Sequence, residues 1–290
     1  MTAIEFKRFS FAYRGKGNVL QDIELTVPQG NFTVISGPCG AGKTTLCMAI
    51  NGLVPHYFGG SVAGEVQVAG CNTLKRKVSD LALQVGSVME DYESQLVAMT
   101  AADEIAFGLE NRGIAKPEIK IRTEQALSLV GLSGKESSEV GSLSGGQKQR
   151  LAIAAVLATE ADILVLDEPA SALDPEGAEE LYALLHSLNR EKGLTIVVVE
   201  HDLSRVLPYI DQLVIMDGGC IVKAGGLEET LSQIYSDGKF INYVPAIYQL
   251  KFSHEKMLAS RLPDWRTERE ALADLSRLLV LKQLEDPKSA

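Results

Sequence analysis

The feature that most constrains this chain is the run Ile35–Thr45, which carries the phosphate-binding pattern G-x-x-x-x-G-K-[ST] from Gly37 to Thr44. The apolar stretch Phe32–Ile35 precedes it, and a helical pattern follows over Leu46–Ile50. Between a strand and a new helix, such a loop points backbone N–H groups and a helix dipole at an anion. The alternative is a glycine-rich turn that only joins the two elements, but it does not explain the lysine and threonine. The sequence therefore predicts a nucleotide site.

The side chains of this loop have separate expected roles. The Lys43 ammonium is expected to reach the β- and γ-phosphates, and the Thr44 hydroxyl to bind Mg²⁺. The residues expected to contact the nucleotide here are Gly37, Pro38, Cys39, Gly40, Ala41, Gly42, Lys43, Thr44 and Thr45.

Two later stretches indicate further anion and metal chemistry. Ser144–Gln147 places a serine and two glycines at the start of a helical pattern, which again directs N–H groups and a hydroxyl at an anion. The unbroken apolar run Ile163–Leu166 is typical of a parallel strand covered on both faces. Asp167 follows it and is placed to hold Mg²⁺, while Glu168 is the candidate for polarising the attacking water.

Two single residues add to this set. The apolar run Thr195–Val199 leads to His201, which can contact the γ-phosphate and hold the water-orienting group in position. Tyr13 closes the predicted half-exposed strand Ile4–Phe11. Taken alone both would be weak signals, because a lone tyrosine or histidine is more often a packed or surface residue.

In this order the motifs resemble the nucleotide-binding subunit of ABC transporters, over roughly Ile4 to Val222. The corresponding motifs are the Walker A loop (Gly37–Thr45), the signature (Leu143–Gln147), Walker B with its catalytic glutamate (Ile163–Glu168), the D-loop (Ser171–Asp174), the switch histidine (His201) and the adenine-stacking aromatic (Tyr13).

The resemblance implies that the chain binds ATP with Mg²⁺, hydrolyses it, and works with a second ABC ATPase subunit as a homo- or heterodimer. In such a dimer the signature residues Ser144, Gly145, Gly146 and Gln147 cover the ATP held by the partner's Walker A loop. Glu168 and His201 would then be the catalytic residues.

The alternation of apolar runs and helical patterns predicts an α/β fold, a P-loop NTPase cassette with a mainly parallel sheet. We expect the cassette to cover residues 1–224, with an N-terminal antiparallel β part and a helical insert at about 96–140. In the insert, Thr100 caps one helix, and Pro117–Leu132 forms another with Ile121, Leu127 and Val130 inward.

Residues 225–290 form a predicted C-terminal extension that is mostly helical. Helical patterns cover Leu227–Tyr235 and Asp264–Leu281, the second with Leu272, Leu275 and Leu279 along one side. Two interpretations remain open for this extension, a helix folded back on the cassette or a dimerisation element.

One position departs from the family pattern. After the predicted strand Val85–Met89, the family usually has a glutamine in its Q-loop, and here the residue is Glu90. Glu90 could bind Mg²⁺ or hydrogen-bond the attacking water, although it adds charge to a site rich in carboxylates. Gln95 could take the role after a local shift, but the strand register favours Glu90.

The totals limit the possible partners. A net charge of −10 over 290 residues argues against nucleic-acid binding, which normally needs a basic patch. No run approaches the ~18 apolar residues of a spanning helix, and the N-terminus does not resemble a signal peptide. Four scattered cysteines indicate neither zinc nor a disulfide framework. These totals favour a reduced, cytoplasmic setting, and the resemblance to ABC transporter subunits implies a peripheral protein at the cytoplasmic face of the cell membrane.

Within the family, Gln95-Leu96 shortly before Asp103–Asn111 resembles the ATPases of energy-coupling factor (ECF) importers, which carry vitamins or transition metal ions such as cobalt and nickel. That resemblance implies a transmembrane coupling protein and a substrate-binding membrane component as partners.

The motifs are also compatible with two other classes of protein. A soluble ABC ATPase acting on DNA or ribosomes typically has a long coiled coil between its motifs or two cassettes in one chain, and neither pattern is found. A non-hydrolysing regulatory cassette is favoured by Glu90, but Glu168 and His201 argue against it.

Overall fold

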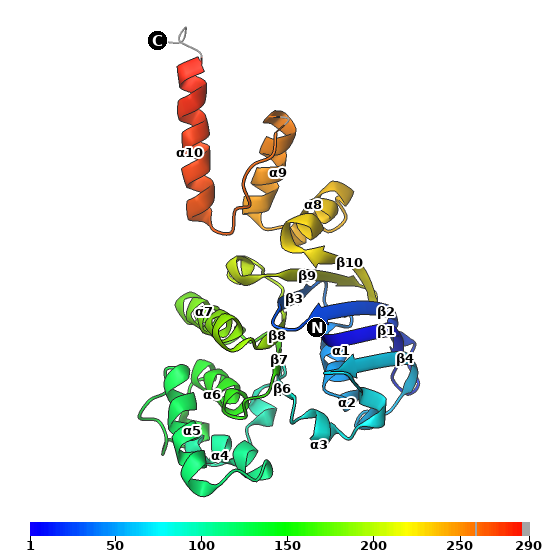
Figure 1. The fold of residues 1–290 in the computed structure, drawn as a ribbon, viewed down its shortest axis with the longest axis vertical. Coiled ribbons are helices and arrows are strands. Elements are labelled where there is room, and N and C mark those ends of the chain that lie inside the picture. Colours follow the sequence, from blue (N-terminus) through cyan, green and yellow to red (C-terminus); the bar gives the residue numbers. More distant parts are fainter. Residues whose placement is uncertain (259, 286–290) are drawn as a thin grey trace.

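Two β-sheets form the centre of the computed structural model, which describes residues 1–258 and 260–285 (Figure 1). The larger sheet has six strands in the order β10-β9-β3-β8-β7-β6. Every neighbouring pair in it is parallel except β10 with β9. Its strands are β3 (Phe32–Ser36), β6 (Val85–Val88), β7 (Ile163–Asp167), β8 (Thr195–Val199), β9 (Gln212–Asp217) and β10 (Cys220–Gly226).

The second sheet contains the N-terminal residues and is antiparallel, in the order β2-β1-β4-β5. Its strands are β1 (Thr2–Ala12), β2 (Asn18–Pro28), β4 (Ser61–Val68) and β5 (Cys71–Asn72). A mainly parallel sheet beside an antiparallel N-terminal sheet is the predicted α/β architecture, and this prediction is confirmed.

Described helices cover both faces of the six-stranded sheet. The α-helices are α1 (Lys43–Ile50), α2 (Leu53–His56), α3 (Val78–Leu81), α4 (Ala101–Asn111), α5 (Lys116–Leu129), α6 (Gly145–Ala158), α7 (Pro175–Lys192), α8 (Leu227–Asp237), α9 (Ala246–Leu258) and α10 (Glu268–Glu285). The short 3₁₀ helices are η1 (Thr73–Lys75), η2 (Glu93–Gln95), η3 (Val140–Ser142), η4 (Leu207–Tyr209) and η5 (Ile241–Tyr243). Among these described helices, none has both the length and the apolar character needed to cross a bilayer.

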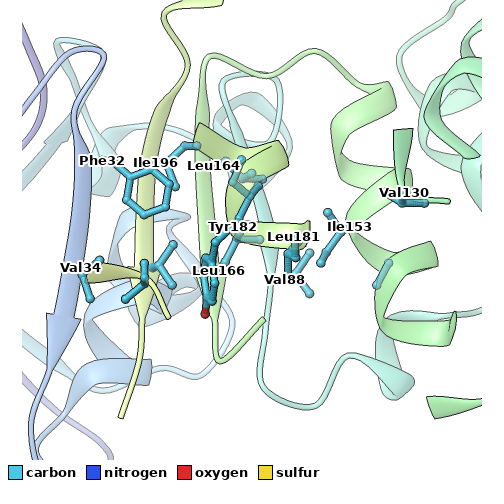
Figure 2. Close-up of a cluster of buried hydrophobic side chains, with 14 of the residues drawn as sticks. Phe32, Val34, Val88, Val130, Ile153, Leu164, Leu166, Leu181, Tyr182 and Ile196 are labelled. Atoms are coloured by element: carbon cyan, nitrogen blue, oxygen red, sulfur yellow. The ribbon is translucent and has the colours of Figure 1, made fainter. Parts of the chain in front are cut away.

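The central strands β3, β7 and β8 are buried at every position, and mostly apolar, because both faces of the sheet are covered. Figure 2 shows part of one face, where Leu164, Leu166 and Ile196 lie in a buried cluster with Leu181 and Tyr182 of α7. Alternate strand residues point to opposite faces. This explains why the sequence shows no alternation here, since each fully buried aliphatic side chain contributes about 1.5–3 kcal/mol on either face.

The other face of the sheet carries a separate buried cluster. Ile163 and Val165 of β7 point into it, together with Leu46 and Ile50 of α1 and apolar residues of the antiparallel sheet. The helix that follows the phosphate-binding loop and the helix that begins with the serine-glycine turn therefore lie on opposite faces of the six-stranded sheet.

The helical insert follows β6 and packs on α6. As predicted, Thr100 caps α4, and its side chain accepts a hydrogen bond from the Asp103 N–H at 3.2 Å. The prediction that Ile121 points inward is wrong, because this side chain is 50% exposed. On α5 the buried face is set by Ile119 and Leu127, and at about 100° per residue Ile121 lies on the opposite side of the helix from Ile119.

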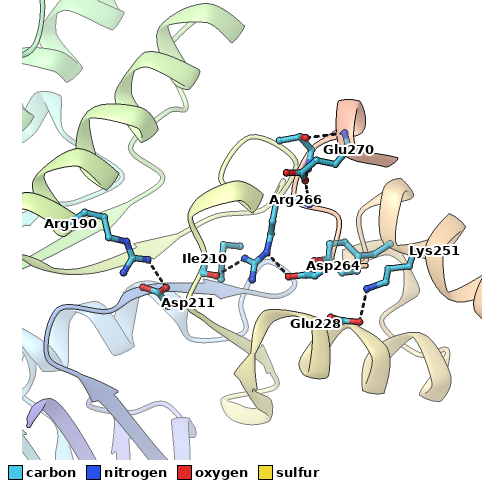
Figure 3. Close-up of polar contacts among 10 residues, drawn as sticks. Arg190, Ile210, Asp211, Glu228, Lys251, Asp264, Arg266 and Glu270 are labelled. Atoms are coloured by element: carbon cyan, nitrogen blue, oxygen red, sulfur yellow. Dashed lines mark hydrogen bonds and ion pairs between the residues drawn. The ribbon is translucent and has the colours of Figure 1, made fainter. Parts of the chain in front are cut away.

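The C-terminal extension packs on the cassette through α8 and α9. Apolar residues of both helices belong to the same buried cluster as the cassette helices. On α9, which the sequence patterns did not predict, the fully buried Lys251 pairs with Glu228 of α8 at 2.5 Å (Figure 3). Arg266 donates to the carbonyl of Ile210 at 2.8 Å and also binds Asp264, which ties the segment before α10 to the cassette (Figure 3).

The last helix starts later than predicted. Residues 264–267 are not helical, and α10 begins at Glu268, because Thr267 and Glu270 form a reciprocal cap at this point. Of the leucines predicted along one side, Leu272 is 66% exposed and Leu275 is half-buried. The side chain of Leu279 lies outside the part of the chain that the structure describes. Beyond its first turns α10 extends away from the cassette (Figure 1).

Candidate active site

The phosphate-binding loop joins β3 to α1, and its shape depends on two glycines. Gly37 has φ of 143°, and a Cβ atom there would lie 2.1 Å from the carbonyl oxygen of Met216. Gly42 has φ of 98°, and its Cβ would lie 2.9 Å from the carbonyl oxygen of Val19. Any other residue would therefore be strained and would collide with backbone. The turn between β9 and β10 also contacts the loop, because the Gly219 N–H donates a hydrogen bond to the Ala41 carbonyl at 3.1 Å.

The lysine of the loop lies inside it. Lys43 is 6% exposed, and its Nζ donates to the carbonyls of Gly37 at 2.8 Å and Pro38 at 3.1 Å. A positive charge held in this curl, at the N-terminus of α1, makes a local anion site in an acidic protein. Pro38 and Ala41 close the turn of the loop with a backbone hydrogen bond of 3.1 Å, and Cys39 is exposed.

Asp167 ends β7 beside this loop and is 1% exposed. Both its carboxylate oxygens are buried without a hydrogen-bond partner of normal geometry among the described residues. Burial raises the pKa of Asp167, and the nearby Thr44 hydroxyl and Lys43 ammonium oppose that rise. Two unpartnered carboxylate oxygens facing a hydroxyl are a set of oxygen donors that Mg²⁺ prefers, so the residues present fit this ion.

Glu168 and His201 meet at the carboxyl ends of β7 and β8. His201 Nε2 lies 2.9 Å from Glu168 Oε1, and both side chains reach solvent. Glu168 has a φ of 53°, a left-handed conformation that is rare for a residue with a side chain. Its N–H donates to the carbonyl of Val199 at 3.1 Å. Such strain costs on the order of 1–3 kcal/mol and, where it occurs, often marks a functional site.

The segment after β6 contains Glu90 and Gln95, the two candidates for the Q-loop position, and their side chains have different surroundings. Gln95 turns back on the strand, because its Oε1 accepts from the Met89 N–H at 2.9 Å and its Nε2 donates to the Ser87 carbonyl at 3.4 Å. Glu90 lies close enough to Asp167 to raise the pKa of that carboxyl. The Glu90 carboxylate is therefore near the metal candidate, and the Gln95 amide is engaged by the backbone of residues 87 and 89.

Tyr13 lies beside the first turns of α1, the helix that follows the loop. Its hydroxyl is 3.2 Å from Thr45 Oγ1, and its ring meets Phe11 edge to face at 4.8 Å. Phe58 packs on the same ring at 6.4 Å. An aromatic ring held beside the phosphate loop in this way can offer a face to a nucleobase.

The serine-glycine turn caps α6 and lies apart from the loop. Ser144 and Gln147 form a capping box, with the Gln147 N–H donating to Ser144 Oγ at 3.3 Å and the Ser144 N–H donating to Gln147 Oε1 at 3.1 Å. Gly145 and Gly146 are the first residues of the helix. Since α6 and α1 cover opposite faces of the sheet, one chain does not bring these residues to its own phosphate loop.

Two polar residues near Glu168, Glu200 and Gln149, were not identified from the sequence. Glu200 accepts a hydrogen bond from the Tyr182 hydroxyl, and burial raises the pKa of Glu200 to about 7. Gln149 on α6 is 1% exposed and bonds to the turn that begins at Glu168. The available signal for Glu200 was a carboxylate directly after a fully apolar strand, the same pattern that identified Asp167.

Comparisons with known proteins agree with this geometry. The family model described as ABC transporter matches residues 20–171. A relative from Pyrococcus abyssi is 44% identical over 235 residues, 81% of this chain and 84% of that protein. A longer one from Streptomyces coelicolor is 43% identical over 214 residues, and the match covers 73% of this chain but 38% of the relative. Both carry only the general, provisional name of ABC transporter ATP-binding protein.

Solved structures show the same fold. CbiO1 from Clostridium perfringens, described as part of the ABC transporter complex cbiONQ, has a TM-score of 0.71 at 29% identity, covering 86% of this chain and 98% of CbiO1. The dimeric ATP-binding cassette MJ0796, described as bound to ADP and Pi, has a TM-score of 0.69 at 27% identity over 77% of this chain and 98% of that cassette. The chain belongs to the ABC transporter ATP-binding family, whose cassettes bind and hydrolyse ATP, and the predicted ATPase activity is confirmed.

The raised pKa of Glu200 predicts a pH dependence of stability. Below about pH 4.5 the carboxyl is protonated in the folded and unfolded states, and the stability contributed by its bound proton is fully present. That contribution is lost as the pH rises toward about 7, because the unfolded chain releases the proton first. Glu200→Gln should remove this loss, so the variant should gain on the order of 2–3 kcal/mol over wild type between about pH 5 and about pH 8.

Urea unfolding of both proteins at several pH values measures this difference. If the two curves of unfolding free energy against pH run parallel, Glu200 does not carry a raised pKa in the folded protein.

Proposed function

We propose that the chain is the ATPase subunit of an ECF-type importer for a vitamin or transition metal ion. The observation that carries this is the similarity to CbiO1, which covers 86% of the chain, more than the predicted cassette 1–224 would supply alone. The same cassette could serve other importers, so the ECF assignment depends on this likeness and on the Gln95–Asn111 segment. The cargo would be chosen by the membrane components.

In the proposed reaction the loop Gly37–Thr45 holds the triphosphate, and the Tyr13 ring stacks on adenine. Glu168 accepts a proton from the attacking water. His201, whose Nε2 lies 2.9 Å from the Glu168 carboxylate, holds that carboxylate in position and contacts the γ-phosphate. Lys43 balances the charge on the transferred group. The left-handed backbone conformation of Glu168 sets the direction of its side chain before ATP arrives.

Mg²⁺ is the proposed metal cofactor, and Asp167, Thr44 and Glu90 are the residues that would hold it, directly or through water. When bound it would neutralise charge on the β- and γ-phosphates. Glu90 would also take the place of the family's glutamine beside the attacking water.

Two subunits are needed to complete the site. ABC cassettes dimerise, and the dimeric cassette MJ0796 is a structural neighbour of this chain. We place Ser144, Gly145, Gly146 and Gln147 against the γ-phosphate of ATP bound to the partner, because the opposite faces of the sheet keep them from their own loop. ATP would thus close the dimer, and hydrolysis would release it.

The membrane partners are a transmembrane coupling protein and a substrate-binding component, and the chain would lie at the cytoplasmic face of the membrane. Three exposed apolar side chains support a docking area next to the Q-loop segment. Val97 and Met99 lie between η2 and α4, and Phe107 lies on α4, with exposed fractions of 65%, 79% and 51%. For residues 225–290 we propose a role at the dimer interface, since α10 extends beyond the cassette while α8 and α9 anchor it.

The role of Glu168 can be tested with Glu168→Gln. The amide cannot accept the proton, so turnover should fall at least about a hundredfold while ATP binding is kept. The variant should also form dimers when ATP is added, measured by light scattering coupled to gel filtration. Wild-type turnover in this variant would remove Glu168 from the mechanism.

The role of Glu90 can be tested with Glu90→Gln. Removing a negative charge near Asp167 should retain or raise ATPase activity, and the Mg²⁺ concentration for half-maximal rate should not increase more than about twofold. Glu110→Gln, the same carboxylate-to-amide change at an exposed position of α4, is the matched control and should leave the rate unchanged. Complete loss of activity in Glu90→Gln would mean that the carboxylate itself is required.

The partner assignment can be tested by co-purification. The tagged chain, isolated from membranes, should retain integral membrane proteins of the coupling and substrate-binding types, identified by mass spectrometry. Phe107→Asp should release them without loss of ATP binding, whereas Ile121→Asp, equally exposed in the same insert, should not. Recovery of ribosomes or DNA in place of membrane proteins would contradict the proposed function.

A further inference from the structure

We propose that Gln149 is a positioning residue for Glu168, joining helix α6 to the turn that carries the catalytic carboxylate. Gln149 lies on α6 and is 1% exposed. Its Nε2 donates to the Glu168 carbonyl and to Ser171 Oγ, both at 3.2 Å, and its Oε1 accepts from the Ala172 N–H at 3.2 Å. One side-chain amide thus spans the turn from Glu168 to Ala172. The inference rests on the proposed role of Glu168.

The bonds act where the backbone is under strain. Glu168 has a φ of 53°, and its own carbonyl is the group that Gln149 binds. On the other side, its N–H is held by the carbonyl of Val199 at 3.1 Å. A residue kept in a left-handed conformation must be fixed by its surroundings, and here two hydrogen bonds hold its peptide groups from both sides.

An amide is suited to this position. It supplies two donors and an acceptor in one plane, and all three directions are used here. The helix also approaches the same turn through Gly146, where a Cβ would lie 3.2 Å from the Ala172 carbonyl oxygen. Packing alone could bring the helix close, but an apolar side chain would leave the Ala172 N–H and part of the Glu168 carbonyl without partners.

The hydrogen bonds of Gln149 would connect the dimer interface to the catalytic carboxylate. Helix α6 begins at the Ser144 cap, which we place on the ATP held by the partner subunit. Gln149 follows on the same helix and binds the turn that carries this subunit's own Glu168. A shift of α6 on closure of the dimer would therefore reach the catalytic carboxylate through one side chain.

The experiment compares Gln149→Met with Ile153→Val, a change of a fully buried residue one turn further along the same helix, whose aliphatic side chain can form no hydrogen bond to the turn. Methionine keeps the volume and removes the three hydrogen bonds. We expect kcat for ATP to fall about tenfold or more, with KM changed less than about twofold, since the phosphate loop is untouched. Ile153→Val should keep kcat within about twofold. Thermal unfolding and titration with a fluorescent ATP analogue establish that both variants are folded and bind nucleotide.

A test in the Glu168→Gln variant distinguishes the positioning role of Gln149 from the proposed catalytic role of Glu168. There Gln149→Met should reduce the residual rate no further, because the group that it positions is already disabled. Unchanged kcat in folded Gln149→Met, an equal fall in Ile153→Val, or a further fall in the Glu168→Gln background would each overturn the inference. If Glu168→Gln itself keeps wild-type turnover, the proposed role of Glu168 fails first.

Discussion

The close approach of two backbone segments at Gly37 determines the rest of the site. With φ of 143° and only 2.1 Å between a would-be Cβ and the Met216 carbonyl oxygen, the chain can turn here only without a side chain. That turn wraps the loop around Lys43 and starts α1 beside it. Binding of ATP, placement of the metal and catalysis all need this curl first.

The parallel sheet then brings together carboxylates that are far apart in sequence. The carboxyl ends of β6, β7 and β8 lie side by side, which places Glu90, Asp167, Glu168 and Glu200 at one edge. Burial, and to a smaller extent the charge of neighbouring carboxylates, raises the pKa values of Asp167 and Glu200. A cluster of carboxylates at this edge is unfavourable without a cation, because the negative charges repel one another. A bound cation offsets that repulsion, so the charge of the carboxylates and the affinity for the cation are coupled.

Much of this could be predicted from the sequence because the signals are local. The loop, the apolar strands and the Thr100 cap depend on neighbouring residues, and the structure has them where the patterns placed them. The errors arose where tertiary packing decides. Ile121 fits a helical pattern, yet only packing against α6 defines which face of α5 is buried. Gln149 looks like an ordinary helical polar residue until the turn at Glu168 folds against it.

The central claim is that one subunit's loop holds ATP and the other subunit's serine-glycine turn seals it. A crystal structure with a nonhydrolysable ATP analogue and Mg²⁺ tests it most directly. The account predicts phosphates within Gly37–Thr44 of one chain, with Ser144–Gly146 of a second chain against the γ-phosphate. An analogue bound elsewhere, or one sealed by residues of the same chain, would contradict it.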